Sequence, residues 1–225
     1  MSLQFIMGNS GSGKSYCLYD TVVREAIENP DKNYLVIVPE QFTMQTQKDL
    51  CLAHPKGGIM NIDVLSFGRL AYRVFEEVGQ DARVVLDDEG KNLVLRKIAG
   101  ECEKDLKVFK GNLKKQGYIS EVKSVLSEFA QYGVDFERLD DFMKEVPPES
   151  YLHYKLDDIR TIYEKFEEYL SEKYITKEEM LDVLSDAVPY SDILKGSVVT
   201  MDGFTGFTPV QNRLIGELFS VCEKV

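Results

Sequence analysis

Tryptophan is absent from this chain of 225 residues, and histidine and cysteine are scarce, with two and four residues. The four cysteines are scattered and form no Cys-x-x-Cys pair, so we expect no zinc or iron–sulfur site built from this chain alone. Long apolar runs are missing too, since none approaches the roughly 20 residues that a membrane-spanning helix needs. These absences predict reduced thiols, a cytoplasmic location and no membrane contact.

Basic residues are the minority, because 27 lysines and arginines stand against 38 aspartates and glutamates, for a formal net charge of −11. A generic nucleic-acid-binding protein would normally carry a basic face, so the composition argues against that class. The apolar fraction of 44% is that of an ordinary globular protein. A chain of this length is expected to bury one core, with room for one sub-domain.

Residues 1–86 alternate short apolar runs with helical patterns, which predicts an α/β domain. We expect strands at Leu3–Met7, at Tyr34–Val38 and near Met60–Leu65, with a helix after each. The second run is apolar on both faces, as is typical of a buried parallel strand.

Residues 87–195 lack a strand signal and repeat apolar residues at three- and four-residue spacing, which predicts amphipathic helices. Residues 196–225 return to an apolar strand, Ser197–Met201, and a last helix that starts at Thr208–Pro209. We interpret the middle stretch as an all-helical insertion within one domain, because the last strand resembles those of the first sheet.

The segment Gly8–Ser15, GNSGSGKS, is a complete G-x-x-x-x-G-K-[ST] motif between a predicted strand and a predicted helix. Its glycines allow successive backbone N–H groups to turn inward around phosphate oxygens. We expect Lys14 to reach the β- and γ-phosphates of ATP and Ser15 to bind Mg²⁺, with the helix N-terminus adding a favourable dipole. The alternative is a Gly/Ser-rich turn that matches the motif by chance.

A P-loop needs a second carboxylate at the end of a neighbouring strand to hold Mg²⁺, and Asp202 is the candidate. The alternative is a simple Asp-Gly turn. Gly203 stands where many P-loop ATPases place the Glu that activates water, which predicts ATP binding without efficient hydrolysis. The predicted ATP site thus comprises Gly8, Asn9, Ser10, Gly11, Ser12, Gly13, Lys14, Ser15 and Asp202, with Ser15 and Asp202 as the Mg²⁺ residues.

Polar and aromatic residues follow the second and third predicted strands, at the edge where open α/β sheets bind ligands. Gln41 and Thr43 have hydrogen-bonding side chains, Arg69 suits a phosphate or a base, and Phe67 and Tyr72 suit stacking on bases. The alternative is that both aromatic residues belong to the core and that Arg69 is a surface charge.

Two further aromatic residues, Phe204 and Phe207, lie in a Gly-rich loop after Asp202. They are candidates for base stacking, and the alternative is packing of the loop on the helical insertion. About 190 residues separate Lys14 from Asp202, far more than in a compact nucleoside kinase. A helical block between these motifs is the arrangement of superfamily 1 helicases.

The runs FIMGNSGSGKS, IVPEQFT, VLSFGRLAYRV and VTMDGFTGFTPVQ together resemble the N-terminal part of the AddB (RexB) family, the B subunits of bacterial AddAB/RexAB helicase–nucleases. The resemblance covers essentially the whole chain. It implies a RecA-like P-loop domain with a parallel sheet, of the 1A type of superfamily 1 helicases, carrying a helical insertion of the 1B type.

The resemblance also implies a function in processing DNA double-strand breaks for recombinational repair, together with an AddA-type helicase–nuclease subunit. The family's helicase-like front half scans single-stranded DNA for Chi, and the matching positions are Gln41, Thr43, Phe67 and Arg69, with Tyr72 where a relative has Trp. The resemblance further implies that nuclease residues and an iron–sulfur cluster belong to a C-terminal part outside this chain. We therefore expect no catalytic residue, no nuclease activity and no efficient ATPase activity in this fragment.

Two other functions remain as alternatives. A free-standing P-loop kinase or phosphotransferase would need an arginine-bearing lid and an acceptor-site acid, and the sequence offers no convincing lid pair. A phosphate-binding module without turnover would use the same loop but would not bind Mg²⁺–ATP with micromolar affinity.

Overall fold

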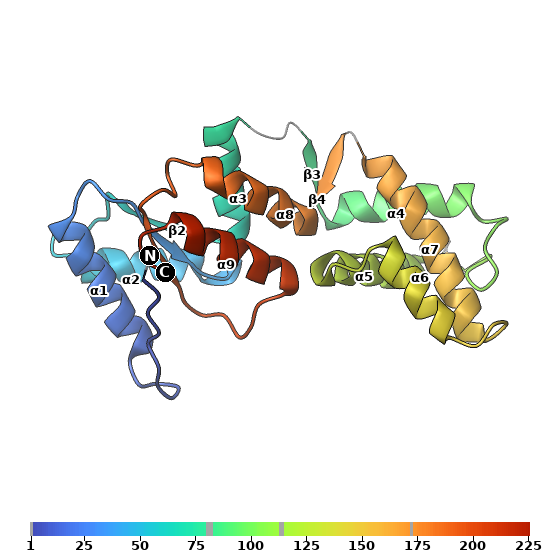
Figure 1. The fold of residues 1–225 in the computed structure, drawn as a ribbon, viewed down its shortest axis with the longest axis horizontal. Coiled ribbons are helices and arrows are strands. Elements are labelled where there is room, and N and C mark those ends of the chain that lie inside the picture. The colour runs from blue at the N-terminus through green and yellow to red at the C-terminus, as the bar shows by residue number, and fades with distance from the viewer. Residues whose placement is uncertain (1, 80–82, 113–114, 172) are drawn as a thin grey trace. The chain divides into compact units, whose positions relative to one another are not determined.

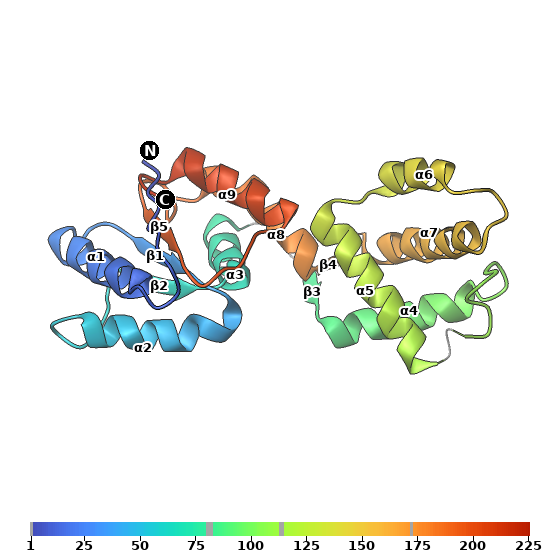
Figure 2. The same ribbon diagram turned by 90° about the horizontal axis from the view of Figure 1, so that it is seen from below.

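A computed structural model describes residues 2–79, 83–112, 115–171 and 173–225, and it is an α/β structure with two small parallel sheets (Figures 1 and 2). The chain forms two compact units. The first comprises Met1–Asp81, Leu181–Phe207 and Gln211–Val225, and the second comprises Ala82–Met180 and Thr208–Val210. The predicted helical stretch ran from 87 to 195, whereas the structure groups residues 181–195 with the first unit.

The first unit is built on a three-stranded parallel sheet in the order β2 (Ile62–Leu65), β1 (Tyr34–Ile37), β5 (Val198–Met201). Val36 of the central strand lies opposite Val64 on one side and Thr200 on the other. All four residues of β1 are buried, as its apolar run predicted.

Helices cover both faces of this sheet. In Figure 2, α1 (Lys14–Glu28) and α2 (Thr43–Ala53) lie on one face, and α3 (Phe67–Val78) and α9 (Pro209–Val221) lie on the other. One core cluster joins α1, α2 and the sheet through Val22, Val23, Ala26, Tyr34, Val36, Val38, Leu50, Ile62 and Val198. The helices expected after the P-loop and after the strands are confirmed. A short 3₁₀ helix, η1 (Glu40–Phe42), precedes α2.

The strand expected at Leu3–Met7 is wrong, because these residues form no strand. Phe5 and Met7 are exposed to 77% and 87%. The N-terminal segment is held at its start by isolated bridging of Ser2 with Lys224, which also bridges Val198 of β5. β1 pairs directly with one side of β5. The other side of β5 is occupied by the last residues of the chain, which lie next to the N-terminal segment in Figure 1.

The described residues of the second unit form the helices α4 (Asp88–Glu101), α5 (Gln116–Tyr132), α6 (Phe136–Glu145) and α7 (Tyr151–Leu170). The amphipathic periodicity is confirmed, because apolar faces of α4, α5 and α7 form one core cluster. Gly117 lies inside α5, whereas Gly133 ends that helix at φ 64°.

A two-stranded parallel sheet was not predicted in this unit. Here β3 (Val84–Leu86) pairs with β4 (Tyr174–Thr176), and each has only three residues, too few to show a periodicity. The next helix is α8 (Lys177–Ala187), followed by η2 (Val188–Tyr190). A capping box begins α8, since Glu179 N–H donates to Thr176 Oγ1 and Thr176 N–H donates to Glu179 Oε2.

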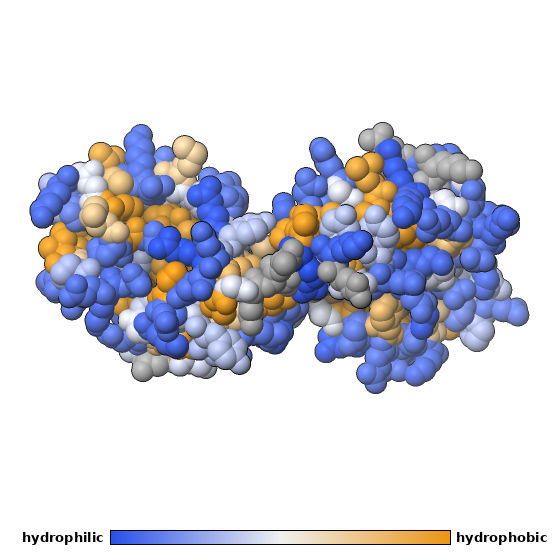
Figure 3. Space-filling view, turned by 90° about the horizontal axis from the view of Figure 1, so that it is seen from above, coloured by the Kyte–Doolittle hydropathy of each residue, from blue (hydrophilic) through white to orange (hydrophobic). Residues whose placement is uncertain are grey.

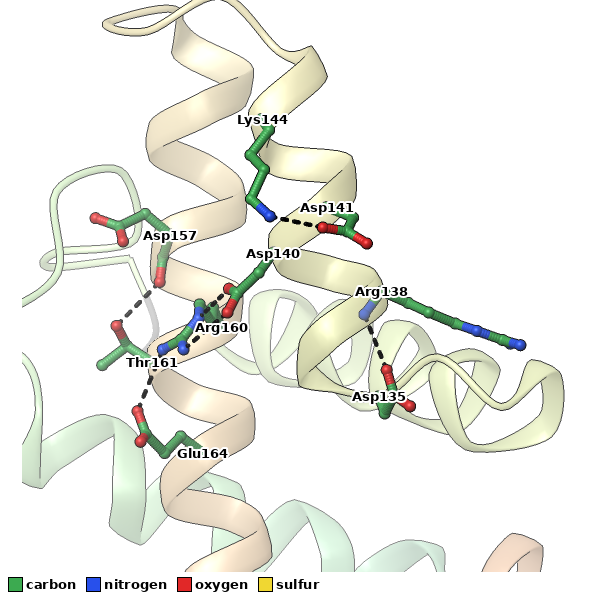
Figure 4. A network of polar contacts seen from close by, with 9 residues as sticks. All are labelled: Asp135, Arg138, Asp140, Asp141, Lys144, Asp157, Arg160, Thr161 and Glu164. Atoms are coloured by element: carbon green, nitrogen blue, oxygen red, sulfur yellow. Dashed lines mark hydrogen bonds and ion pairs between the residues drawn. The ribbon is translucent and has the colours of Figure 1, made fainter.

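Charged side chains join α6 to α7. The guanidinium of Arg160 points toward Asp140 in Figure 4, with Nε–Oδ1 and Nη2–Oδ2 distances of 2.6 and 3.3 Å. This bidentate contact lowers the pKa of the Asp140 carboxyl. Among the described residues, no helix is long and apolar enough to cross a membrane. The face in Figure 3 is mostly hydrophilic, with smaller hydrophobic areas on both units.

Candidate nucleotide site

The segment Gly8–Ser15 forms a turn that leads directly into α1. Gly11 and Gly13 have φ angles of 74° and 84°, in the left-handed region that favours glycine. Gly13 is the N-cap residue of α1, and no hydrogen bond from a side chain caps this helix in the described part of the chain. The first N–H groups of α1 thus face the loop and form an electropositive end that suits phosphate.

Lys14 folds back over the loop. Its Nζ donates to Gly8 O at 2.9 Å and to Asn9 O at 2.8 Å, and Ser12 N–H donates to Asn9 O at 3.2 Å. The ammonium therefore lies at the mouth of the turn, where a phosphate would replace the two carbonyl oxygens as its partner. A methyl group at Gly8 would lie 2.5 Å from Ser12 Oγ, so the Ser12 hydroxyl would have to move to make room for it.

Asp202 follows β5, as predicted, and its backbone N–H donates to Ile37 O at 3.1 Å. Its carboxylate accepts a hydrogen bond from Tyr19 Oη on α1 at 2.9 Å. A carboxylate oxygen is the kind of ligand that Mg²⁺ and its bound waters prefer. The donor set of this region therefore fits ATP with Mg²⁺: Lys14 and the α1 N–H groups for phosphates, and Ser15 and Asp202 for the metal.

Lys14 and Asp202 line a common cavity of about 280 Å³. Its walls are residues 4–6, the inward side of α1, β5 and residues 224–225. The structure thus brings the predicted lysine and carboxylate to one cavity, although about 190 residues separate them in sequence. Ser15 is exposed and is not part of the wall.

The two stretches that follow β1 and β2 meet through Glu40. Its Oε2 accepts a short hydrogen bond from Ser66 Oγ, and its Oε1 lies 3.4 Å from Arg69 Nε. Its backbone oxygen accepts from Thr43 Oγ1 at 2.9 Å. The predicted polar residues therefore lie at one edge of the sheet, as expected for the carboxyl ends of parallel strands.

Three aromatic rings gather beside this edge. The ring centroid of Phe67 lies 5.4 Å from that of Phe204 and 6.4 Å from that of Phe207, and the last two are 5.0 Å apart. Phe67 is buried, whereas Phe207 is exposed to 37%. The three rings pack together as a hydrophobic cluster, and the ring of Phe207 is partly exposed to solvent.

The candidate DNA-contact residues differ in exposure. Gln41 is exposed, Tyr72 is exposed to 56% and the side chain of Arg69 to 57%. Thr43 and Phe67 are buried, and the Thr43 hydroxyl is engaged with Glu40. The described surface near this edge therefore exposes an amide, a guanidinium and a phenol.

Sequence reasoning missed Tyr19 and Glu40. Tyr19 lies on α1, the helix that begins at Lys14, but no motif marks it. Glu40 directly precedes Gln41 in the sequence, but no motif indicates its contacts with Ser66 and Arg69.

Known proteins are similar to this chain over nearly its whole length. Residues 5–225 match the family model described as ADDB, N-terminal. A protein of Lachnoclostridium phytofermentans, named as the B subunit of an ATP-dependent helicase/deoxyribonuclease, is 48% identical over 225 residues, which are 100% of this chain and 20% of that protein. Proteins of the same name from Clostridium tetani and Thermoanaerobacter sp. are each 37% identical over 227 residues, again 100% of this chain and 20% of theirs.

The chain spans about a fifth of the length of these curated relatives. The turn at Gly8–Ser15, the carboxylate after β5 and the polar edge all lie within the residues that the family model matches. This chain belongs to the AddB N-terminal family.

Proposed function

We propose that this chain is an ATP-binding, helicase-like domain of the B subunit of a helicase–deoxyribonuclease that processes DNA double-strand breaks. The turn at Gly8–Ser15 is the observation that supports this proposal most. Two glycines with left-handed backbone angles place the N-terminus of α1 and the Lys14 ammonium at the opening of the same turn. The parallel sheet with helices on both faces is consistent with a RecA-like fold of the 1A type, and the helical unit with a 1B-type insertion.

In this proposal the N–H groups of the loop and the Lys14 ammonium bind the phosphates of ATP, and Ser15 and Asp202 hold Mg²⁺. The metal would neutralise phosphate charge. Asp202 is followed by Gly203, whose φ of 78° forms a turn without a carboxylate to activate water. We therefore propose nucleotide binding with little turnover, so that ATP occupancy regulates rather than drives the subunit.

The exposed Gln41, Arg69 and Tyr72 and the partly open ring of Phe207 form the proposed contact surface for single-stranded DNA, including a Chi sequence. Thr43 and Phe67 are buried beneath this surface. The net charge of −11 makes affinity for DNA weak in the isolated chain, because contacts to phosphates dominate such binding. We propose that an AddA-type subunit supplies the remaining contacts by delivering the strand to this surface.

Calorimetric titration with Mg²⁺–ATP tests the proposal. The chain should bind with micromolar affinity, and Lys14→Ala should weaken binding at least tenfold, because the variant loses a charge-assisted contact to phosphate. Lys32→Ala is the matched control, since Lys32 is paired with Glu223 at 2.7 Å and its removal should leave binding unchanged.

The same samples should hydrolyse ATP at a negligible rate. Equal affinity for Mg²⁺–ATP and for inorganic phosphate would instead support a phosphate-binding module. Rapid phosphate transfer to a small acceptor would support a kinase. Absence of any nucleotide binding would contradict the proposal.

A further inference from the structure

A tyrosine of α1 connects two other elements of the nucleotide site. Tyr19 Oη lies 2.9 Å from Asp202 Oδ2 at the end of β5 and 3.3 Å from Thr46 Oγ1 of α2. Three elements that are far apart in the sequence therefore meet at one phenol. Neither the P-loop motif nor the carboxylate motif includes this residue.

The chemistry of the groups fixes the direction of the two hydrogen bonds. An ionised carboxylate only accepts, so the single proton of the Tyr19 hydroxyl goes to Asp202. Thr46 Oγ1 is then the donor to Tyr19 Oη. Burial, and to a lesser extent the charge of Asp202, raise the pKa of Tyr19 to about 12, so the phenol remains a donor at neutral pH.

The surroundings hold this chain of hydrogen bonds in place. Tyr19 packs against the core cluster between α1, α2 and the sheet, and Thr46 is exposed to only 4%. After Asp202 the backbone turns at Gly203, where an added Cβ would lie 3.3 Å from Phe42 Cδ2. The backbone N–H of Asp202 donates to Ile37 O at 3.1 Å, and the hydrogen bond to Tyr19 holds its side chain.

We propose that Tyr19 is a positioning residue that orients the Asp202 carboxylate for the magnesium ion of bound ATP. The hydrogen bond uses Oδ2, so Oδ1 carries lone pairs for a magnesium-bound water. Groups that orient a metal-binding carboxylate in this way contribute strongly to metal affinity although they do not touch the metal. This inference rests on the proposed function, because it assumes that Asp202 serves Mg²⁺–ATP.

A purely structural tie between α1 and β5 is the competing explanation. It predicts that loss of the hydroxyl lowers the stability of the first unit and affects ATP binding equally with and without Mg²⁺. A positioning function predicts a selective effect on the magnesium-dependent part. The two explanations therefore differ in a measurable quantity.

The test is calorimetric titration of the chain with ATP in the presence and absence of Mg²⁺, for the unsubstituted protein and for Tyr19→Phe, Asp202→Asn and the double variant. Tyr19→Phe should weaken Mg²⁺–ATP binding about tenfold and leave magnesium-free ATP binding within about twofold. The double variant should bind no more weakly than Asp202→Asn alone, because both changes remove the same contribution. Tyr190→Phe is the control, since that tyrosine is exposed to 66%.

Equal losses with and without Mg²⁺, no loss in Tyr19→Phe, or losses that multiply in the double variant would each overturn the inference while leaving the proposed function intact. If the unsubstituted chain binds no ATP, the proposed function fails and the inference fails with it. Should Tyr19→Phe not fold, Thr46→Val decides, because it removes the donor to Tyr19 and keeps the ring. A smaller, magnesium-specific loss supports the inference, and an unchanged magnesium dependence overturns it.

Discussion

The buried carboxylate of Asp158 accepts hydrogen bonds from three backbone N–H groups. The residue is exposed to 1%, and its carboxylate accepts hydrogen bonds from the N–H groups of Lys107, Val108 and Phe109 at 2.8, 2.7 and 2.8 Å. These three residues belong to the loop after α4, while Asp158 lies on α7. The carboxylate therefore fixes a loop that has no regular structure of its own.

Replacing Asp158 with asparagine should destabilise the helical unit by about 2–4 kcal/mol, because one carboxylate oxygen becomes an NH₂ group facing a backbone N–H. Urea unfolding followed by circular dichroism measures this, since the chain has no tryptophan. Asp157→Asn is the matched control: its exposed pair with Lys107 should contribute less than about 1 kcal/mol. Equal effects of the two substitutions would show that the backbone contacts carry no special stability.

At the scale of single elements, α7 carries a carboxyl group with an unusual proton affinity. Burial, and next the negative charge of Glu179, raise the pKa of Glu167 from 4.5 to about 7. Both residues lie in the helical unit. Because the folded state holds this proton more tightly than the unfolded state, the contribution of Glu167 to stability is present below pH 4.5 and is lost as the pH rises through 7.

Glu167→Gln should therefore increase the free energy of unfolding at pH 8.5 by on the order of 1 kcal/mol, with a smaller gain at pH 6. The full shift would correspond to about 3 kcal/mol, and solvent around this half-buried group reduces it. Urea unfolding at the two pH values measures the difference. Glu168→Gln, an exposed neighbour, should show no such pH dependence. A gain that is the same at both pH values would contradict the perturbed pKa.

The sequence predicted elements well where several local signals agreed. Helix α3 follows β2 as expected, because Ser66 accepts from Arg69 N–H at its start and Gly79, at φ 69°, ends it. The strand prediction for Leu3–Met7 was wrong, because an apolar run alone does not determine whether a neighbouring strand pairs with it. The strands β3 and β4 were missed because each is only three residues long.

At the scale of the whole molecule, the sequence placed the candidate site better than it described its contacts. The P-loop motif and the residue after the last strand were sufficient to place Lys14 and Asp202, which share a cavity. The partners Tyr19 and Glu40 depend on which helices and strands lie side by side, and single-sequence patterns do not contain that information. The burial of Thr43 and Phe67 depends on tertiary packing in the same way.

In the proposed function, the net charge of −11 and the exposed polar edge belong to a domain that contacts a strand held by a partner, rather than to one that captures DNA by itself. Nucleotide is then the ligand that the isolated chain should bind on its own. The site for it lies wholly within the first unit, whose residues include both Lys14 and Asp202.

Hydrogen–deuterium exchange with and without Mg²⁺–ATP locates that ligand most directly. We expect nucleotide to slow exchange at Gly8–Ser15 and at the first turn of α1, where backbone N–H groups would bind phosphate, and Lys14→Ala to abolish this protection. Unchanged exchange at these amides under saturating Mg²⁺–ATP, or protection confined to other residues, would contradict nucleotide binding through this loop.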